Sequence, residues 1–294
     1  MKIRAVFFTF LFFYLTLAAF AQTSRGTVTG TITDPNGSVI AGAAVILTNT
    51  GTAVSRSTVT NNQGIYRFDA VDLGDYTIKF TATGFGEVVK SNVVVSANQT
   101  ATIDTQLQPG AQALSISVTA ETGALLQTET PVRGGNIDST RIVELPVATR
   151  NPAMLALTLP GVSTNRFGFG VGTFSVNGGR GRSNNFLIDG TENNDISVAG
   201  QGFQIKNPDA VQEVSVQTSN YDAEFGRAGG AVVNVVTKSG GRRFHGTASW
   251  QYDTTRDDAI TNRQSLSDDI RKRGYPPYGT EHIFAGTLGG PVRL

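Results

Sequence analysis

The sequence has 294 residues, a formal net charge of +1 and no cysteine. This length suggests about two domains of roughly 150 residues each. The absence of cysteine excludes disulfides, zinc–thiolate sites, a cysteine nucleophile and a lipidated N-terminal cysteine. A hydrophobic fraction of 39% with 34 glycines favours small packed β domains over one large core. The near-neutral charge gives no electrostatic reason to predict a nucleic-acid partner.

The N-terminus has the pattern of a signal peptide. Two basic residues precede an apolar run at residues 5–18, and small side chains stand at the positions that signal peptidase requires. We expect residues 1–21 to be removed by cleavage between Ala21 and Gln22, and an uncleaved membrane anchor is the alternative. No later segment has the ~18 consecutive apolar residues of a membrane helix. Any further membrane contact is therefore expected to use strands.

Residues 25–108 are predicted to form a domain of short strands and turns. Residues 27–33 alternate between threonine and apolar or small residues. At residues 34–37, Asp-Pro-Asn-Gly predicts a turn, because proline presets φ while asparagine and glycine tolerate positive φ. Period-two strands with short turns indicate an antiparallel sandwich. Further strands are predicted at residues 44–48, 65–70, 76–83, 93–95 and 102–107.

Three segments of this domain, GTVTGTITDPNGSVIAGAAV, NNQGIYRF and LGDYTIKFTATGF, occur in an order that resembles the carboxypeptidase regulatory-like domain. That family is a transthyretin-like β-sandwich without catalytic residues. The resemblance implies that Tyr76 and Phe80 fill the core. It also implies that Gly74 and Gly84 stand where the backbone needs positive φ.

Residues 111–135 look like a polar linker with one apolar piece, LSISVTA. In this piece Leu114, Ile116, Val118 and Ala120 alternate with polar residues. It resembles the region where TonB-dependent receptors carry their TonB box, an extended segment that adds a strand to the energy-coupling protein TonB. The four residues are therefore candidate TonB contacts. A first strand of the following domain is the alternative interpretation.

Two short helices are predicted between residues 137 and 161. Asp138 or Ser139 caps the first helix, and the proline at position 146 ends it. Asn151 caps the second helix, and Pro152 occupies its first position. The segment RIVELPVATRNPAMLALTLPGV resembles the early plug domain of TonB-dependent receptors, where a short helix lies beside a buried sheet.

The rest of the predicted plug consists of strands joined by glycine-rich turns. Residues 213–218 and 231–238 are strand-like runs joined by a bend at residues 226–230. Before them, FSVNGGRGRSNNFLIDGTENND places a Gly-Gly-Arg turn between two strands and then an acidic turn. This order resembles the plug hallmark and predicts an α+β plug over residues 113–240. The hallmark-turn candidates are Gly178, Gly179, Arg180, Asp189 and Gly190.

The sequence gives little support for catalysis or metal binding. The glycines at residues 168–181 lack the Lys-Ser/Thr of a Walker loop and lie between strands. Asp189, Glu192 and Asp195 are spaced like a loose calcium loop but lack the glutamate that completes an EF-hand. Both histidines fall in predicted strands, and no nucleophile elbow occurs. We therefore predict no enzyme activity, cofactor or metal, with a hydrolase that uses an acid pair as a further alternative.

Residues 241–294 are predicted to begin a membrane barrel. Across residues 244–253 apolar and polar residues alternate as in an outer-membrane strand, with Trp250 and Tyr252 suited to the interfacial aromatic girdle. Residues 282–288 begin a second strand, and GTLGGPV resembles an early hairpin of the large Oar-like receptors. A closed barrel needs at least ~8 strands. We therefore expect the chain to be the N-terminal part of a longer polypeptide.

The predicted fold is mainly β: a transthyretin-like β-sandwich, an α+β plug and the first strands of an incomplete outer-membrane β-barrel. The resemblance implies a TonB-dependent receptor of the cell outer membrane that binds and imports a ligand. Its partners would be TonB, outer-membrane lipid and a ligand of the siderophore, carbohydrate or peptide class. The alternative is a secreted or surface-attached β-sandwich adhesion protein without a barrel.

Overall fold

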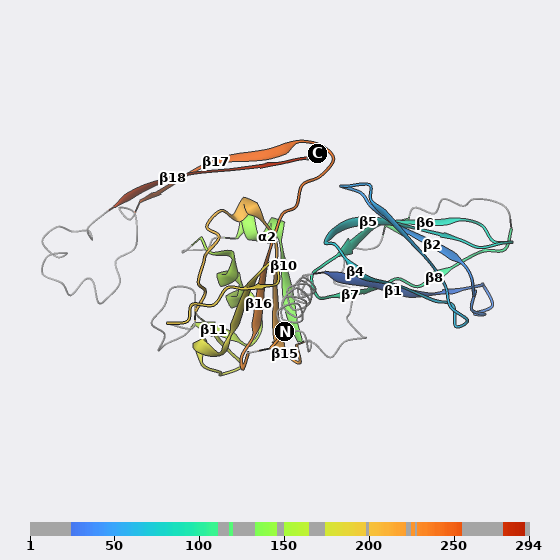
Figure 1. Ribbon diagram of the computed structural model, residues 1–294, viewed down its shortest axis with the longest axis horizontal. Helices are drawn as coiled ribbons and strands as arrows, with labels where there is room; N and C mark the ends of the chain where they lie inside the picture. Colours follow the sequence, from blue (N-terminus) through green and yellow to red (C-terminus); the bar gives the residue numbers. More distant parts are fainter. Residues whose placement is uncertain are drawn as a thin grey trace, which may run out of the picture. The chain divides into compact units, whose positions relative to one another are not determined.

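The computed structural model describes most of the chain after the N-terminal segment, in nine stretches. Strands dominate these stretches (Figure 1). The chain divides into two compact units, Met1–Arg242 and Arg243–Leu294. The predicted cleavage between Ala21 and Gln22 lies outside the described residues. The residues that the structure describes are 25–110, 118–119, 133–145, 150–164, 174–197, 200–221, 225–226, 228–254 and 279–291.

The first sheet of the sandwich is built around β1 (Gly26–Thr33). β4 (Ile65–Val71) pairs with β1 antiparallel, whereas the short β7 (Thr100–Thr102) and β8 (Thr105–Gln106) pair with it in parallel. The predicted antiparallel pairing therefore holds for β4 but not for β7 and β8, and the prediction of one strand at residues 102–107 was wrong. Asp104 interrupts that strand because its carboxylate accepts the backbone N–H of Thr31 at 2.8 Å, in place of a ladder carbonyl.

The second sheet has the order β3-β2-β5-β6-β9. All its pairs are antiparallel except β9, which lies parallel to β6. The sequence did not predict β3, because its residues are mostly polar and none is buried. The strands are β2 (Ala44–Asn49), β3 (Ser55–Val59), β5 (Gly74–Thr81), β6 (Val88–Val95) and β9 (Val118–Thr119).

The two sheets enclose one apolar core and appear as separate layers in Figure 1. The predicted alternation in β5 is confirmed, because Tyr76, Ile78 and Phe80 are buried while the residues between them are partly exposed. Tyr66 joins this core, where its Oη donates to the carbonyl of Ile103 at 2.8 Å and its ring lies edge-on to Phe80. Each such large side chain contributes about 1.5–3 kcal/mol on burial.

The predicted special turns of the sandwich are confirmed. Gly74 and Gly84 have φ of 135° and 85°, in the region that favours glycine. In the turn at residues 34–37, Gly37 also has positive φ, and the Asp34 carboxylate accepts the N–H groups of Asn36 and Ser38. These turns set the register of the strands that they join.

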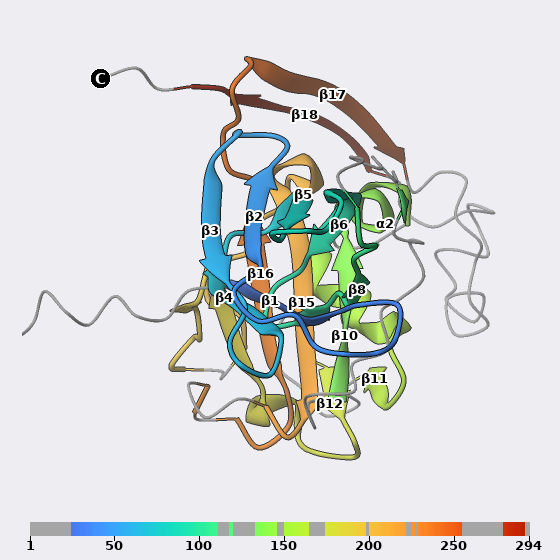
Figure 2. The ribbon, with the colours of Figure 1, turned by 90° about the vertical axis from the view of Figure 1, so that its right-hand side faces the viewer.

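The plug contains a five-stranded sheet of order β10-β15-β16-β13-β14. β15 (Val211–Ser219) and β16 (Val232–Thr237) pair antiparallel and confirm the two predicted runs. β13 (Asn185–Ile188) lies parallel to β16, and β14 (Thr191–Glu192) closes that side. β10 (Arg133–Asp138) pairs with β15, and the two lie side by side in Figure 2.

The prediction that the polar linker extends to residue 135 was wrong, because β10 starts at Arg133. β10 has a single large apolar residue, Ile137, which is buried. Its sequence carries no alternation, so its strand conformation depends on pairing with β15. Gly134 permits this pairing, since a Cβ there would collide with the backbone of Val216.

Two helical segments cover the apolar face of the plug sheet. α2 (Ser139–Glu144) is capped by Asp138, whose carboxylate accepts the N–H of Arg141, and it ends at Leu145. η1 (Pro152–Thr158) is a 3₁₀ helix capped by Asn151. Both predicted caps are confirmed. The smaller elements are η2 (Gly181–Ser183), η3 (Pro208–Ala210) and the strand pair β11 (Val162–Thr164) and β12 (Phe174–Val176).

The plug sheet has one apolar and one polar face. On β15, Val214 and Val216 point into the plug core under the helices. Because side chains alternate along a strand, Glu213, Ser215 and Gln217 lie on the opposite face, where they are also buried. The second face therefore buries polar side chains that need hydrogen-bond partners.

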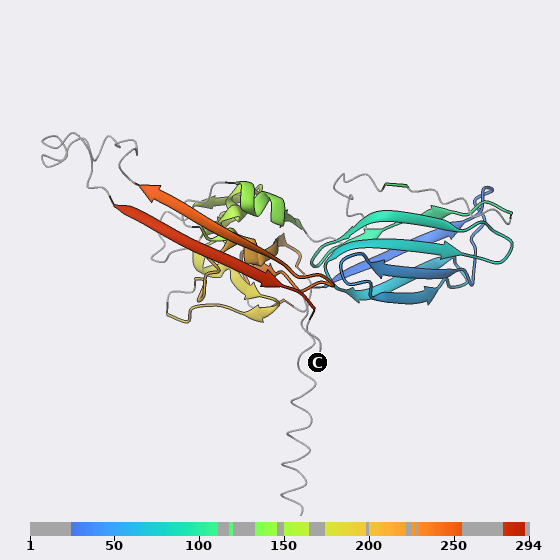
Figure 3. The same ribbon diagram turned by 90° about the horizontal axis from the view of Figure 1, so that it is seen from above.

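The second unit is a long hairpin of β17 (His245–Thr254) and β18 (Thr280–Gly289), drawn in orange and red in Figure 3. The strands pair antiparallel along their whole length. This confirms both predicted strands, the first shifted by one residue and the second longer than predicted. They form an open two-stranded sheet. No helix among the described residues is long and apolar enough to cross a membrane.

Candidate functional site

The acidic turn of the predicted hallmark joins two plug strands. Asp189 and Gly190 both have positive φ, at 49° and 79°, as a tight turn after β13 requires. The Asp189 carboxylate accepts the backbone N–H and the hydroxyl of Thr237, both at 2.8 Å. Gly190 donates its N–H to Asn234 Oδ1 at 3.2 Å. The turn therefore ties the end of β13 to the end of β16.

The Gly-Arg turn lies after β12. Gly178 has a φ of 76°, Gly179 donates its N–H to Val176, and Arg180 is exposed. Asn177 fixes the turn by donating to the carbonyl of Thr218, near the end of β15. No hydrogen bond holds the side chains of this turn to those of the acidic turn in the described part of the chain.

The two turns lie at opposite ends of β15. Thr237, which contacts Asp189, pairs with Val211 at the start of β15, whereas Asn177 contacts the other end. β15 has nine residues, so these ends are roughly 26 Å apart. The five hallmark candidates therefore form two separate turns and not one cluster.

The acidic residues of the loose calcium pattern have protein partners. Asp189 binds Thr237, and Asp195 accepts the N–H and hydroxyl of Ser197. Glu192 accepts from Asn194 at 3.2 Å. Across the described ranges, no group of three or more His, Cys, Asp or Glu residues is arranged to hold a metal ion.

Buried and partly buried asparagines, which the sequence reasoning missed, join the plug segments. Asn184 donates to the carbonyl of Phe174 at 2.7 Å and accepts the N–H of Ala231 at 3.1 Å. Asn194 accepts the N–H of Phe186 and donates to Asn185. The pairs Asn184-Asn185 and Asn193-Asn194, on either side of a short strand, were the available signal.

Of the candidate TonB contacts, Val118 is described and Leu114, Ile116 and Ala120 lie outside the described residues. Val118 and Thr119 form β9, which pairs in parallel with β6 of the sandwich, Val118 opposite Lys90. The alternative of a first plug strand is therefore wrong for these two residues. The structure instead shows Val118 and Thr119 paired as a strand added to the sandwich.

Two plug side chains clamp the backbone of one sandwich residue, Ala97. Glu213 Oε1 accepts the N–H of Ala97 at 3.0 Å, and Asn136 Nδ2 donates to the carbonyl of Ala97 at 3.2 Å. Asn136 also donates to Glu213 Oε1 at 2.6 Å. Burial raises the pKa of Glu213 to about 7, against the lowering effect of the hydrogen bonds from the Ala97 N–H and the Ser96 side chain. The clamp therefore contains a buried acid that titrates near neutral pH.

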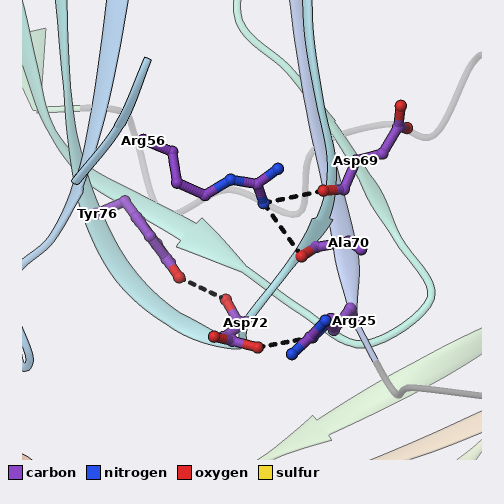
Figure 4. A network of polar contacts seen from close by, with 6 residues as sticks. All are labelled: Arg25, Arg56, Asp69, Ala70, Asp72 and Tyr76. Carbon is purple, nitrogen blue, oxygen red and sulfur yellow. Dashed lines mark hydrogen bonds and ion pairs between the residues drawn. The ribbon is translucent and has the colours of Figure 1, made fainter. Parts of the chain in front are cut away.

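The polar network at one end of the sandwich has a structural role (Figure 4). Arg56 donates to the carbonyls of Asp69 and Ala70, at 2.9 and 3.1 Å. Tyr76 Oη donates to the carbonyl of Asp72, whose carboxylate pairs with Arg25. These bonds close the turn between β4 and β5. Tyr76 is therefore a core residue, as predicted, with its hydroxyl used in the turn.

The hairpin exposes one aromatic face. Trp250 lies opposite Phe284, with ring centroids 6.3 Å apart, and also stacks on His282. Five large apolar side chains are more than half exposed, and a soluble surface seldom presents so many together. They are Phe244, Trp250, Tyr252, Phe284 and Leu288.

Two protein families match the chain in the order that the fold shows. Residues 27–108 match the "Carboxypeptidase regulatory-like domain", and residues 127–233 match the "TonB-dependent Receptor Plug Domain". The chain therefore carries a carboxypeptidase regulatory-like domain followed by the plug domain of the TonB-dependent receptor class.

Within this class, the chain is 30% identical over 292 residues to the "TonB-dependent transporter Oar" of Myxococcus xanthus. The alignment covers 94% of this chain and 26% of the relative, so the chain spans about a quarter of that protein's length. This match bears out the resemblance to Oar-like receptors.

Two solved structures are also similar to this chain. The outer membrane transporter YddB of Escherichia coli is 24% identical, with a TM-score of 0.35, over 44% of this chain and 19% of that one. The siderophore receptor PirA of Pseudomonas aeruginosa is 20% identical, with a TM-score of 0.37, over 54% and 26%.

Proposed function

We propose that the intact protein is an outer-membrane receptor that imports a ligand through a barrel closed by its plug, with energy from TonB. The observation that carries the proposal is the order of parts in one chain. A sandwich and a segment able to pair as a strand precede a plug sheet, and a hairpin with an exposed aromatic face follows it. TonB would bind the segment from the periplasm and rearrange the plug when ligand is bound outside.

The proposed organisation has four parts. Residues 1–21 are a signal peptide, residues 25–108 the sandwich, residues 113–240 the plug and residues 241–294 the start of the barrel. Cleavage between Ala21 and Gln22 would leave the mature protein in the outer membrane. Mass spectrometry of the mature N-terminus tests this, since a peptide that starts before Gln22 contradicts the site.

We assign the chain no catalytic role and no cofactor. The ligand would be a siderophore, a carbohydrate or a peptide, and its recognition would lie mainly in barrel loops. The two hallmark turns, at Gly178–Arg180 and at Asp189–Gly190, would keep the plug sheet rigid while other parts of the plug move. Their contacts with β15 and β16 support this positioning role.

The TonB contact is proposed for the segment that contains Leu114, Ile116, Val118 and Ala120. Strand addition requires an extended backbone with N–H groups available for pairing. Val118→Pro removes one N–H and restricts the backbone, so it should reduce capture of the chain by the periplasmic domain of TonB by about tenfold or more. The measurement is capture of the purified full chain on immobilised TonB domain.

Thr128→Pro is the matched control, because it places proline in the same linker outside the apolar piece. It should leave capture unchanged. Equal capture of all three proteins would remove Val118 from the contact. Absence of capture even for the wild-type chain would favour the adhesion-protein alternative, which needs no TonB.

A further inference from the structure

We propose that the sandwich edge strand β6 is a docking surface for the chain's own TonB-binding segment, so that β6 and TonB compete for it. This inference rests on the proposed function of the segment around Val118. The docking surface is formed by the backbone of Lys90 and Ser91. The sandwich would then control how readily TonB engages the receptor.

The pairing itself is the first support. β9 is the last strand in the order β3-β2-β5-β6-β9, and its register places Val118 opposite Lys90 and Thr119 opposite Ser91. Adding a strand to an open edge is also the way in which such a segment would bind TonB. Pairing with β6 occupies backbone groups on one side of β9 and ties it to the sandwich. TonB that adds to this same side of the segment would therefore have to displace β6.

A bulge in β6 explains why the docking surface is short. Tyr76 of β5 pairs with Val93, while Ile78 pairs with Lys90, so β6 has one extra residue between these pairs. Asn92 lies in this bulge with a φ of 58°. Bulges twist an edge strand and limit further pairing. The surface next to the bulge therefore accepts a two-residue strand, which is weak enough to be released.

The short linker between the sandwich and Val118 compensates for the weak pairing of this two-residue strand. Seven residues separate Gly110, at the end of the sandwich, from Val118. A short tether gives an effective concentration of about a millimolar or more, so weak pairing still keeps the surface occupied. β6 itself is also held in place, because Lys90 Nζ donates to the carbonyl of Asp104 at 2.5 Å. Burial lowers the pKa of that ammonium group.

The same strand reaches the plug. β6 ends at Val95 and leads directly into Ser96 and Ala97, and Ala97 is the residue that Glu213 and Asn136 clamp. One sandwich strand is therefore paired with the segment on one side and bonded to the plug at its end. A plug rearrangement that breaks the clamp would loosen the strand that holds the segment.

The absence of cysteine allows a direct test. The double variant Ser91→Cys with Thr119→Cys places two thiols at register partners, where neighbouring strands bring Cα atoms within the range for a disulfide. The matched control is Ser57→Cys with Thr119→Cys, because β3 lies at the opposite edge of the same sheet. Each full chain is oxidised, and its disulfide content and capture by the TonB periplasmic domain are measured before and after reduction.

We expect the Ser91 pair to form a disulfide and the Ser57 pair to form little. The oxidised Ser91 pair should lose TonB capture by about tenfold or more and recover it on reduction. Equal cross-linking of both pairs overturns the docking surface. A cross-linked chain that binds TonB as well as the reduced one overturns the competition. Cross-linking of the Ser91 pair with no capture of any chain, wild type included, supports the docking surface and overturns the proposed TonB function instead.

Discussion

At the scale of single residues, amide side chains join the plug segments. Asn184 bridges Phe174 and Ala231, which are 57 residues apart in sequence, and each bond replaces a backbone partner that the loops lack. Local signals were predictable, such as the caps Asp138 and Asn151. These caps bond within three residues of themselves. The long-range bridges could not be predicted, because nothing in the sequence around Asn184 specifies Ala231 as its partner.

Glu213 leads to a prediction about pH. Burial raises its pKa to about 7 from the usual 4.5, and the nearby Asp138 carboxylate also raises it. Since the folded-state pKa lies above the unfolded value, the stability gained from proton binding is complete below about pH 4.5. It is lost as the pH rises through about 7. Urea unfolding of the full chain should therefore show a stability that falls over this range.

Glu213→Gln keeps an oxygen that accepts from Ala97 and Asn136 but does not titrate. Relative to wild type it should gain stability by up to about 3 kcal/mol between pH ~5 and ~8. Glu144→Gln, at an exposed position on α2, is the control and should follow the wild-type pH dependence. A Glu213→Gln variant with the wild-type slope would show that this acid does not titrate in the clamp.

At the scale of elements, the sequence predicted strands that carry their own alternation and missed those that depend on a partner. β5 and β15 have clear apolar faces and were predicted. β3 and β10 have few apolar residues and become strands because they pair with β2 and β15. The division of residues 102–107 into β7 and β8 depends on Asp104, whose contact with Thr31 involves distant sequence.

The bend between β15 and β16 provides a second prediction. A Cβ on residue 230 would lie 2.5 Å from Asn184 Oδ1. That oxygen cannot move without loss of the bonds of Asn184 to Phe174 and Ala231. Gly230→Ala should therefore destabilise the plug by about 1–3 kcal/mol in urea unfolding.

Gly226→Ala is the matched control in the same bend. A Cβ at this position meets nothing within 4 Å, so stability should stay within about 0.5 kcal/mol of wild type. Equal stability losses for the two variants would mean that Asn184 does not restrict the bend.

At the scale of the whole molecule, the chain carries a built-in probe of the hairpin environment. Trp250 is its single tryptophan and lies on the exposed aromatic face beside Phe284. If that face meets lipid, Trp250 emission of the purified chain in lipid vesicles should be blue-shifted and quenched by brominated lipid tails. Trp250→Phe should remove the signal. Emission typical of water, insensitive to brominated lipid, would contradict a lipid-facing hairpin.

If this chain forms the plug end of a receptor, TonB should engage it at the segment around Val118. Photo-crosslinking tests this engagement in cells that produce the protein from its own gene, with a photoreactive amino acid at position 118 and, as control, at position 128. We expect a TonB adduct in the outer-membrane fraction from position 118 and little from position 128. A protein that fractionates away from the outer membrane and forms no TonB adduct from position 118 would contradict it.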